Sequence, residues 1–196
     1  MNYFILFAKP FLVNLLILVP FIVYFMWRKK GIFLPGKTLA ILALFGLAFG
    51  FNEAATLLDL RASSGLLPGY NGTLADVIQQ SAEIHEQAQL IAKLPESLYT
   101  IEFIREIFTM IMLISIGIIS SRFWPERFVA FLWTFAIWDS VYYCSLWIAI
   151  RWPSSLLDYD FLFFVPIPWY SQVWYPLLVS TLTIITVLLL RKSKEA

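Results

Sequence analysis

The chain has 196 residues, of which 60% are hydrophobic and 18% aromatic, and its mean hydropathy is +0.77. Only 14% of the residues are charged and the net charge is +1, so the composition excludes an ordinary soluble domain and a basic nucleic-acid-binding surface. The single cysteine, Cys144, excludes an internal disulfide and a cysteine-based zinc cluster. We therefore expect an all-α integral membrane protein with a single membrane domain over residues 1–196.

Five apolar segments are long enough to cross a bilayer, which requires about 20 mostly apolar residues per helix. They are residues 3–27, 38–58, 98–121, 127–150 and 172–190. The first segment lacks a basic start and exceeds the apolar run of a signal peptide, so we expect it to be retained as a transmembrane helix.

Basic residues between these segments predict how the chain is oriented. Nine of the 14 Lys and Arg residues fall on one side: Arg28, Lys29, Lys30, Lys37, Arg122, Arg127, Arg191, Lys192 and Lys194. By the positive-inside rule this side is cytoplasmic, which puts the N-terminus outside and the C-terminus in the cytoplasm.

The two long connections then lie on the outer side. Residues 74–94 follow a capping-box pattern, Thr73 with Asp76, and alternate apolar and polar residues with a helical period, which predicts an amphipathic surface helix. Residues 151–171 are short and broken by prolines, which favours a re-entrant or interfacial loop.

Ionisable residues in three different segments are predicted to lie in the outer half of the membrane. Glu102, Arg105 and Glu106 have the spacing of one helix face, and Glu53 and Asp139 lie at similar depth in the segments 38–58 and 127–150. Intramembrane ionisable residues are costly and usually functional, so we predict a buried polar pocket between three helices.

The glycines Gly46 and Gly50 precede Glu53 by about two turns and one turn. Small residues at this spacing let a neighbouring helix approach closely, which would bring Glu53 to the pocket.

Four carboxylates in this pocket face one cation, Arg105, and an unpaired buried carboxylate is strongly unfavourable. Either bound protons or a divalent metal of unspecified identity would neutralise the excess. The predicted metal ligands are Glu53, Glu102, Glu106, Asp139 and the only imidazole, His85. In this hypothesis Arg105 orients a carboxylate or substrate, and Tyr142 or Tyr143 donates a proton.

Each of these residues also has a structural interpretation. Arg105 could form a salt bridge within its own helix, His85 could be a solvated surface residue, and Tyr142 and Tyr143 could serve packing alone. Asp158 and Asp160, in the segment "DYD", are expected to form a loop turn and a cap for the next segment.

The C-terminal third resembles a family of small bacterial polytopic membrane proteins. The segments "WDSVYYCSLW", "RWP" and "DYDFLFFVPIPW" are similar to that family's Trp-Asp-x-x-Tyr-Tyr helix, Trp-Pro turn and Asp-x-Leu-Phe…Pro-x-Pro-Trp loop. The resemblance implies a shared site on the outer face and a location in the bacterial cytoplasmic (inner) membrane, and it implies no particular activity.

The favoured functional hypothesis is a metal-dependent enzyme that acts on a membrane lipid or another apolar small molecule. A proton- or cation-coupled transporter is the first alternative, although every candidate residue lies in the outer half and the sequence has no inverted repeat. A non-catalytic subunit of a membrane complex is the other alternative. No nucleic-acid partner is expected.

Overall fold

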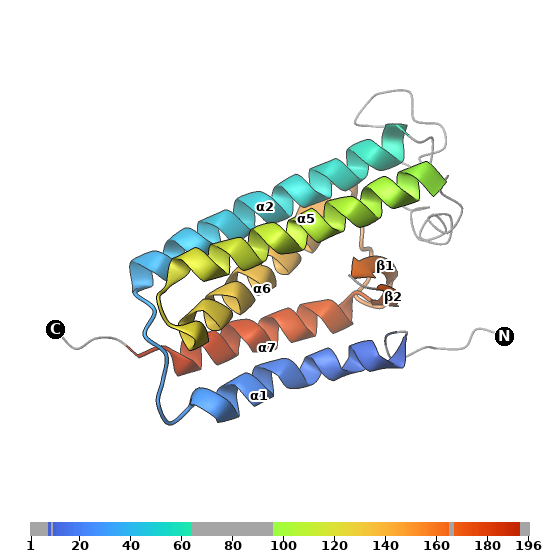
Figure 1. The fold of residues 1–196 in the computed structure, drawn as a ribbon. Coiled ribbons are helices and arrows are strands. Elements are labelled where there is room, and N and C mark those ends of the chain that lie inside the picture. Colours follow the sequence, from blue (N-terminus) through green and yellow to red (C-terminus); the bar gives the residue numbers. More distant parts are fainter. Residues whose placement is uncertain (1–7, 9, 64–95, 165–166, 193–196) are drawn as a thin grey trace.

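The computed structural model describes residues 8, 10–63, 96–164 and 167–192. These residues form a helical bundle with one small β-hairpin at its end (Figure 1). The elements are η1 (Phe11–Ile17), α1 (Leu18–Trp27), α2 (Gly36–Ser63), α5 (Glu96–Ser120), α6 (Trp124–Ile150), β1 (Tyr159–Phe164), β2 (Ile167–Gln172) and α7 (Trp174–Leu190). The predicted amphipathic helix at 74–94, with His85, lies outside the described residues.

Three helices are long and apolar enough to cross a membrane, namely Gly36–Asp59, Thr100–Ser120 and Trp124–Ile150. They coincide with the second, third and fourth predicted segments and are consistent with an integral membrane protein. The first and last segments correspond to shorter apolar helices, Phe11–Trp27 and Trp174–Leu190. The total of five spans and the orientation of the termini stay predictions.

Helix α6 lies at the centre of the bundle, in contact with α2, α5 and α7, while α1 packs on α7 (Figure 1). It begins beside Pro125, which is favourable in the first turn of a helix. It ends at Ile150 because Arg151 adopts a left-handed conformation, with φ of 60°.

The contact between α2 and α6 depends on glycine. A Cβ atom at Gly46 would lie 2.9 Å from the carbonyl oxygen of Thr134, and one at Gly50 would lie 2.5 Å from that of Trp138. Both separations are too short for a side chain, so these glycines let the two backbones approach. The predicted role of Gly46 and Gly50 is confirmed, and Glu53 follows one turn later on the same helix.

Residues 151–171 contain regular structure that the sequence analysis did not predict. Strands β1 and β2 pair in antiparallel fashion, with Tyr159 opposite Gln172 and Asp160 opposite Ser171. The backbone N–H of Val173 donates to the carbonyl of Asp158 at 2.9 Å, which ties the hairpin to the start of α7. The hairpin therefore lies against the helix ends and contributes a side chain to the site described below.

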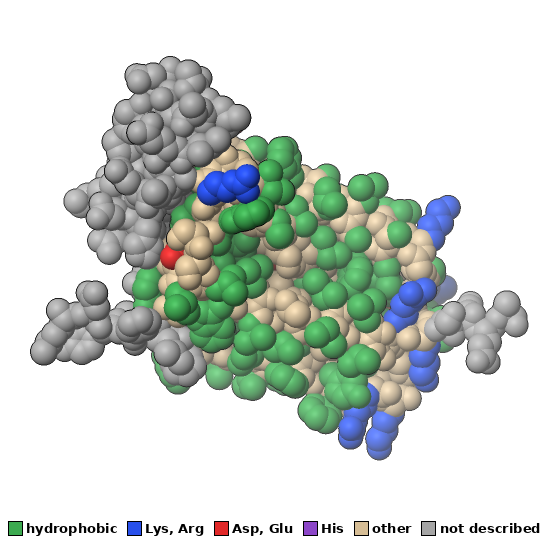
Figure 2. All heavy atoms as spheres, turned by 180° about the vertical axis from the view of Figure 1, so that it is seen from behind, with side chains coloured by type: hydrophobic (Ala, Val, Ile, Leu, Met, Phe, Trp, Pro, Cys, Tyr) green, Lys and Arg blue, Asp and Glu red, His purple; other side chains and the backbone are tan. Residues whose placement is uncertain are grey.

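The two ends of the bundle differ in charge. One end of the bundle contains the C-terminal ends of α1, α5 and α7 and the N-terminal ends of α2 and α6 (Figure 1). Figure 2 shows Lys and Arg side chains gathered at this end. Hydrophobic side chains cover much of the face between the ends (Figure 2). We call the two ends the basic end and the hairpin end.

Candidate functional site

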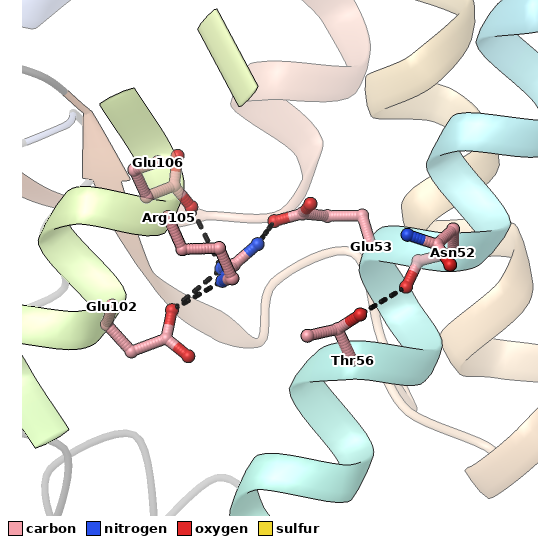
Figure 3. Close-up of polar contacts among 6 residues, drawn as sticks. All are labelled: Asn52, Glu53, Thr56, Glu102, Arg105 and Glu106. Atoms are coloured by element: carbon pink, nitrogen blue, oxygen red, sulfur yellow. Dashed lines mark hydrogen bonds and ion pairs between the residues drawn. The ribbon is translucent and has the colours of Figure 1, made fainter. Parts of the chain in front are cut away.

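Arg105 is the centre of an ion cluster near the hairpin end (Figure 3). Its Nε donates to Oε2 of Glu102 at 2.9 Å, and its Nη2 lies 3.2 Å from Oε1 of Glu106. Its Nη1 forms an ion pair with Oε1 of Glu53 on α2. One guanidinium thus bonds to three carboxylates from two helices, because its fork of five N–H donors can serve several acceptors at once.

The cluster is shielded from the surroundings. Glu53 is 5% exposed and Glu102 is 3% exposed, whereas the side chain of Arg105 is 21% exposed. Thr56, three residues after Glu53, donates its hydroxyl to the carbonyl of Asn52 at 2.9 Å within α2 (Figure 3). The shielded acids of α2 and α5 thus share Arg105 as their ion-pair partner.

Asp139 has a different partner. It is buried on α6, and its Oδ2 accepts a hydrogen bond of 2.7 Å from the hydroxyl of Ser180 on α7. The prediction of a buried Asp139 is confirmed, but its bonded partner belongs to the fifth segment, whereas the sequence analysis grouped it only with the second and third.

Tyr143 connects α6 to the hairpin. Its hydroxyl donates to Oδ2 of Asp160 at 2.9 Å, and both residues are buried. The ring of Tyr142 lies 5.1 Å from that of Tyr143, edge to face, and Tyr142 is only partly buried. Tyr143, which was predicted as a proton donor together with Tyr142, is therefore bonded to a carboxyl group of the site.

Asp160 is the functional candidate that the sequence analysis missed. It is 1% exposed, it accepts the hydrogen bond from Tyr143, and it lies close enough to Glu106 and to Asp139 for like-charge repulsion with each of them. The loop turn predicted for Asp158 and Asp160 is found at Asp158, since its Oδ2 accepts bonds from the backbone N–H groups of Ser154 and Ser155, whereas Asp160 lies within β1. Asp158 lies before β1 and Asp160 lies within it, so no local sequence pattern distinguishes the buried aspartate from the one in the turn.

The site within the described residues thus contains five acids and one cation. The acids are Glu53, Glu102, Glu106, Asp139 and Asp160, and the cation is Arg105. If every group were ionised, the formal charge would be −4, that is five negative charges against one positive.

The described residues include no group of three or more His, Cys, Asp or Glu side chains that could hold a metal ion. Glu53, Glu102 and Glu106 meet at Arg105, Asp139 lies with Ser180, and His85 is outside the described part of the chain. Metal binding by the five predicted ligands stays a prediction.

No known family model, curated protein or solved structure matches this chain. The fold and the site together describe a helical membrane protein with a buried acidic cluster at one end of its bundle. Function therefore has to be inferred from the chemistry of that cluster.

Proposed function

We propose that the chain is a proton- or cation-coupled membrane carrier whose buried acidic cluster takes up and releases the protons. The observation that supports this most strongly is that the site has five acids and one arginine among the described residues, and that Arg105 pairs with only three of these acids. Asp160 raises the number of carboxyl groups beyond the four that the sequence analysis had counted. This excess is larger than Arg105 alone can neutralise.

An ionised carboxylate that is moved out of water and left unpaired is destabilised by several kcal/mol. Protons remove this penalty without requiring a preformed ligand geometry. The hydroxyls of Ser180 and Tyr143 suit such exchange, because a hydroxyl can donate to an ionised carboxylate and accept from a protonated one. Each pair can therefore keep a hydrogen bond in both protonation states.

Two further polar groups lie beside the Tyr143–Asp160 pair. Trp152 packs on Tyr143 with ring centroids 6.3 Å apart, and Ser171 is paired with Asp160 across the hairpin. Within the described part of the chain, Nε1 of Trp152 and Oγ of Ser171 are buried without a hydrogen-bond partner. These groups are suited to bind a polar solute or water next to the acids.

A carrier also needs a polar route beyond the acidic cluster, and α7 supplies candidates. Ser180, Thr183 and Thr186 are buried and follow one another at intervals of three residues from the level of Asp139 toward the basic end. The Thr186 hydroxyl donates to the carbonyl of Pro20 on α1 at 3.4 Å. These buried hydroxyls supply polar groups between the acidic cluster and the basic end, where the sequence alone offered no candidate site residue.

Proton uptake into liposomes tests this proposal. The purified protein is reconstituted with a pH-sensitive dye inside the vesicles, and a potassium gradient with valinomycin drives the flux. We expect the wild type to acidify the lumen and Asp139→Asn to abolish the response. Asp158→Asn, which changes an acid in the turn before β1, is the matched control and should behave as wild type. Equal leak in wild-type, Asp139→Asn and protein-free vesicles would contradict a carrier.

A metal-dependent enzyme that acts on a lipid or apolar substrate is the second candidate. Its support is that Glu53, Glu102 and Glu106 each direct one carboxylate oxygen to Arg105, and a carboxylate has a second oxygen available as a ligand. Elemental analysis of wild type, Glu102→Ala and Asp139→Ala tests it. Stoichiometric metal that both variants lose would support the enzyme, and metal retained in both would contradict this ligand set. Absence of both metal and proton uptake would favour a non-catalytic subunit.

A further inference from the structure

A cavity lies at the basic end of the bundle, remote from the acidic cluster. Its volume is about 680 Å³, within the range of ligand pockets in proteins. It is lined by residues from the α1–α2 connection, the α5–α6 turn and the end of α7, among them Phe33, Thr38, Phe123, Arg191 and Lys192. Apolar rings and two cations thus share one cavity.

Backbone pairing fixes the two cations beside this cavity. Ile32 forms a parallel bridge with Arg191, in which the N–H of Ile32 donates to the carbonyl of Leu190 at 2.8 Å and the N–H of Lys192 donates to that of Ile32 at 3.0 Å. The guanidinium of Arg191 lies against Gly36, where a Cβ atom would come within 2.7 Å of Nη2. The position of Arg191 therefore depends on the glycine at the start of α2.

The cavity also contains one acid. Glu126 lines it and accepts a hydrogen bond from the hydroxyl of Ser121, while Nε of the neighbouring Arg127 donates to the carbonyl of Ser121 at 2.7 Å. With Arg191 and Lys192 opposite Glu126, the formal charge of the lining residues is +1, that is two positive charges and one negative. The cavity is thus complementary to a singly charged anion.

Apolar side chains extend from the same cavity to the surface of the bundle. Phe33 and Phe123 are 41% and 64% exposed, and Trp124, which follows Phe123, is 69% exposed. At the end of a membrane-crossing bundle, such side chains lie where lipid acyl chains meet the headgroups. Basic pockets between transmembrane helices are suited to phosphate-bearing lipid headgroups.

We propose that this cavity binds the headgroup of an anionic phospholipid, with its phosphate at Arg191 and Lys192 and its acyl chains along Phe33 and Phe123. A soluble phosphate compound shares the headgroup chemistry but lacks acyl chains, so it would gain only the contact with the two cations. The lipid is favoured because the exposed rings adjoin the cations.

Native mass spectrometry in a neutral detergent tests this inference, with phosphatidylglycerol as the probe. We expect the double variant R191Q/K192Q to bind the lipid about 10- to 30-fold more weakly than wild type. The control R28Q/K29Q removes the same charge at the same end but outside the cavity lining. It should change the affinity by less than about threefold, because neither residue lines the cavity and salt weakens the interactions of exposed charges.

A third variant, Gly36→Ala, keeps every charge and displaces the Arg191 guanidinium, so it should also weaken binding. This variant shows whether binding depends on the position of the Arg191 guanidinium when the net charge is unchanged. Equal binding by wild type and R191Q/K192Q, or equal losses in R191Q/K192Q and R28Q/K29Q, would overturn the proposal. Displacement of the lipid by millimolar inorganic phosphate would also overturn it, and would indicate a soluble phosphate ligand instead.

Discussion

Replacement of Arg105 by glutamine tests how far the acidic cluster depends on its cation. Arg105 pairs with three carboxylates, and the side chains of Glu53 and Glu102 are only 6% and 4% exposed. Removal of one partner from a buried ion pair costs about 3–5 kcal/mol. Because Arg105 itself is 21% exposed and the acids can take up protons, we expect a loss near the lower limit, about 3 kcal/mol.

The measurement is the free energy of unfolding in mixed micelles titrated with dodecyl sulfate. Arg151→Gln is the control, because Arg151 is exposed and its guanidinium lies 4.7 Å from the ring centroid of Trp147, an interaction of about 0.5–1 kcal/mol. The loss in Arg105→Gln should shrink in acidic solution, since protonation removes the charges that lack a partner. Equal losses for the two variants, or no dependence on pH, would refute this account of the cluster.

Two other substitutions test how the bundle positions the site. Ser180→Ala removes the donor to Asp139 and should lower the free energy of unfolding by about 1–3 kcal/mol, whereas its exposed neighbour Thr181→Ala should cost less than about 0.5 kcal/mol. Gly50→Ala would put a methyl group 2.5 Å from a carbonyl oxygen of α6 and should cost about 1–3 kcal/mol, measured the same way. Ala48→Leu on the exposed face of α2 is its control, and comparable losses in the two α2 variants would contradict the proposed close contact.

Helix positions were predictable because they depend on local hydropathy and local breakers. Helices α2, α5 and α6 coincide with three predicted segments to within a few residues, and α6 has Pro125 in its first turn and ends at the left-handed Arg151. The hairpin was not predictable in the same way. Its strands depend on pairing between Asp160 and Ser171 and on a bond to the start of α7, and neither has a local signature in a segment that contains several prolines.

The site was partly predictable for a similar reason. Helical spacing identified Glu102, Arg105 and Glu106 as one face, and glycine spacing indicated that Glu53 would approach it. Which acid pairs with which group depends on the tertiary arrangement. Helical spacing alone therefore groups Asp139 with the Arg105 cluster, and no local pattern indicates that a strand brings Asp160 near Glu106 and Asp139.

The central claim is that the buried acidic cluster holds protons, and infrared spectroscopy of the carboxyl stretching band tests it most directly. Protonated carboxyl groups give a band that ionised carboxylates lack, so wild-type protein at neutral pH should show it. Part of the band should disappear in Glu106→Gln and in Asp139→Asn, and it should persist unchanged in Asp158→Asn. A wild-type spectrum at neutral pH without protonated carboxyl groups would contradict the claim.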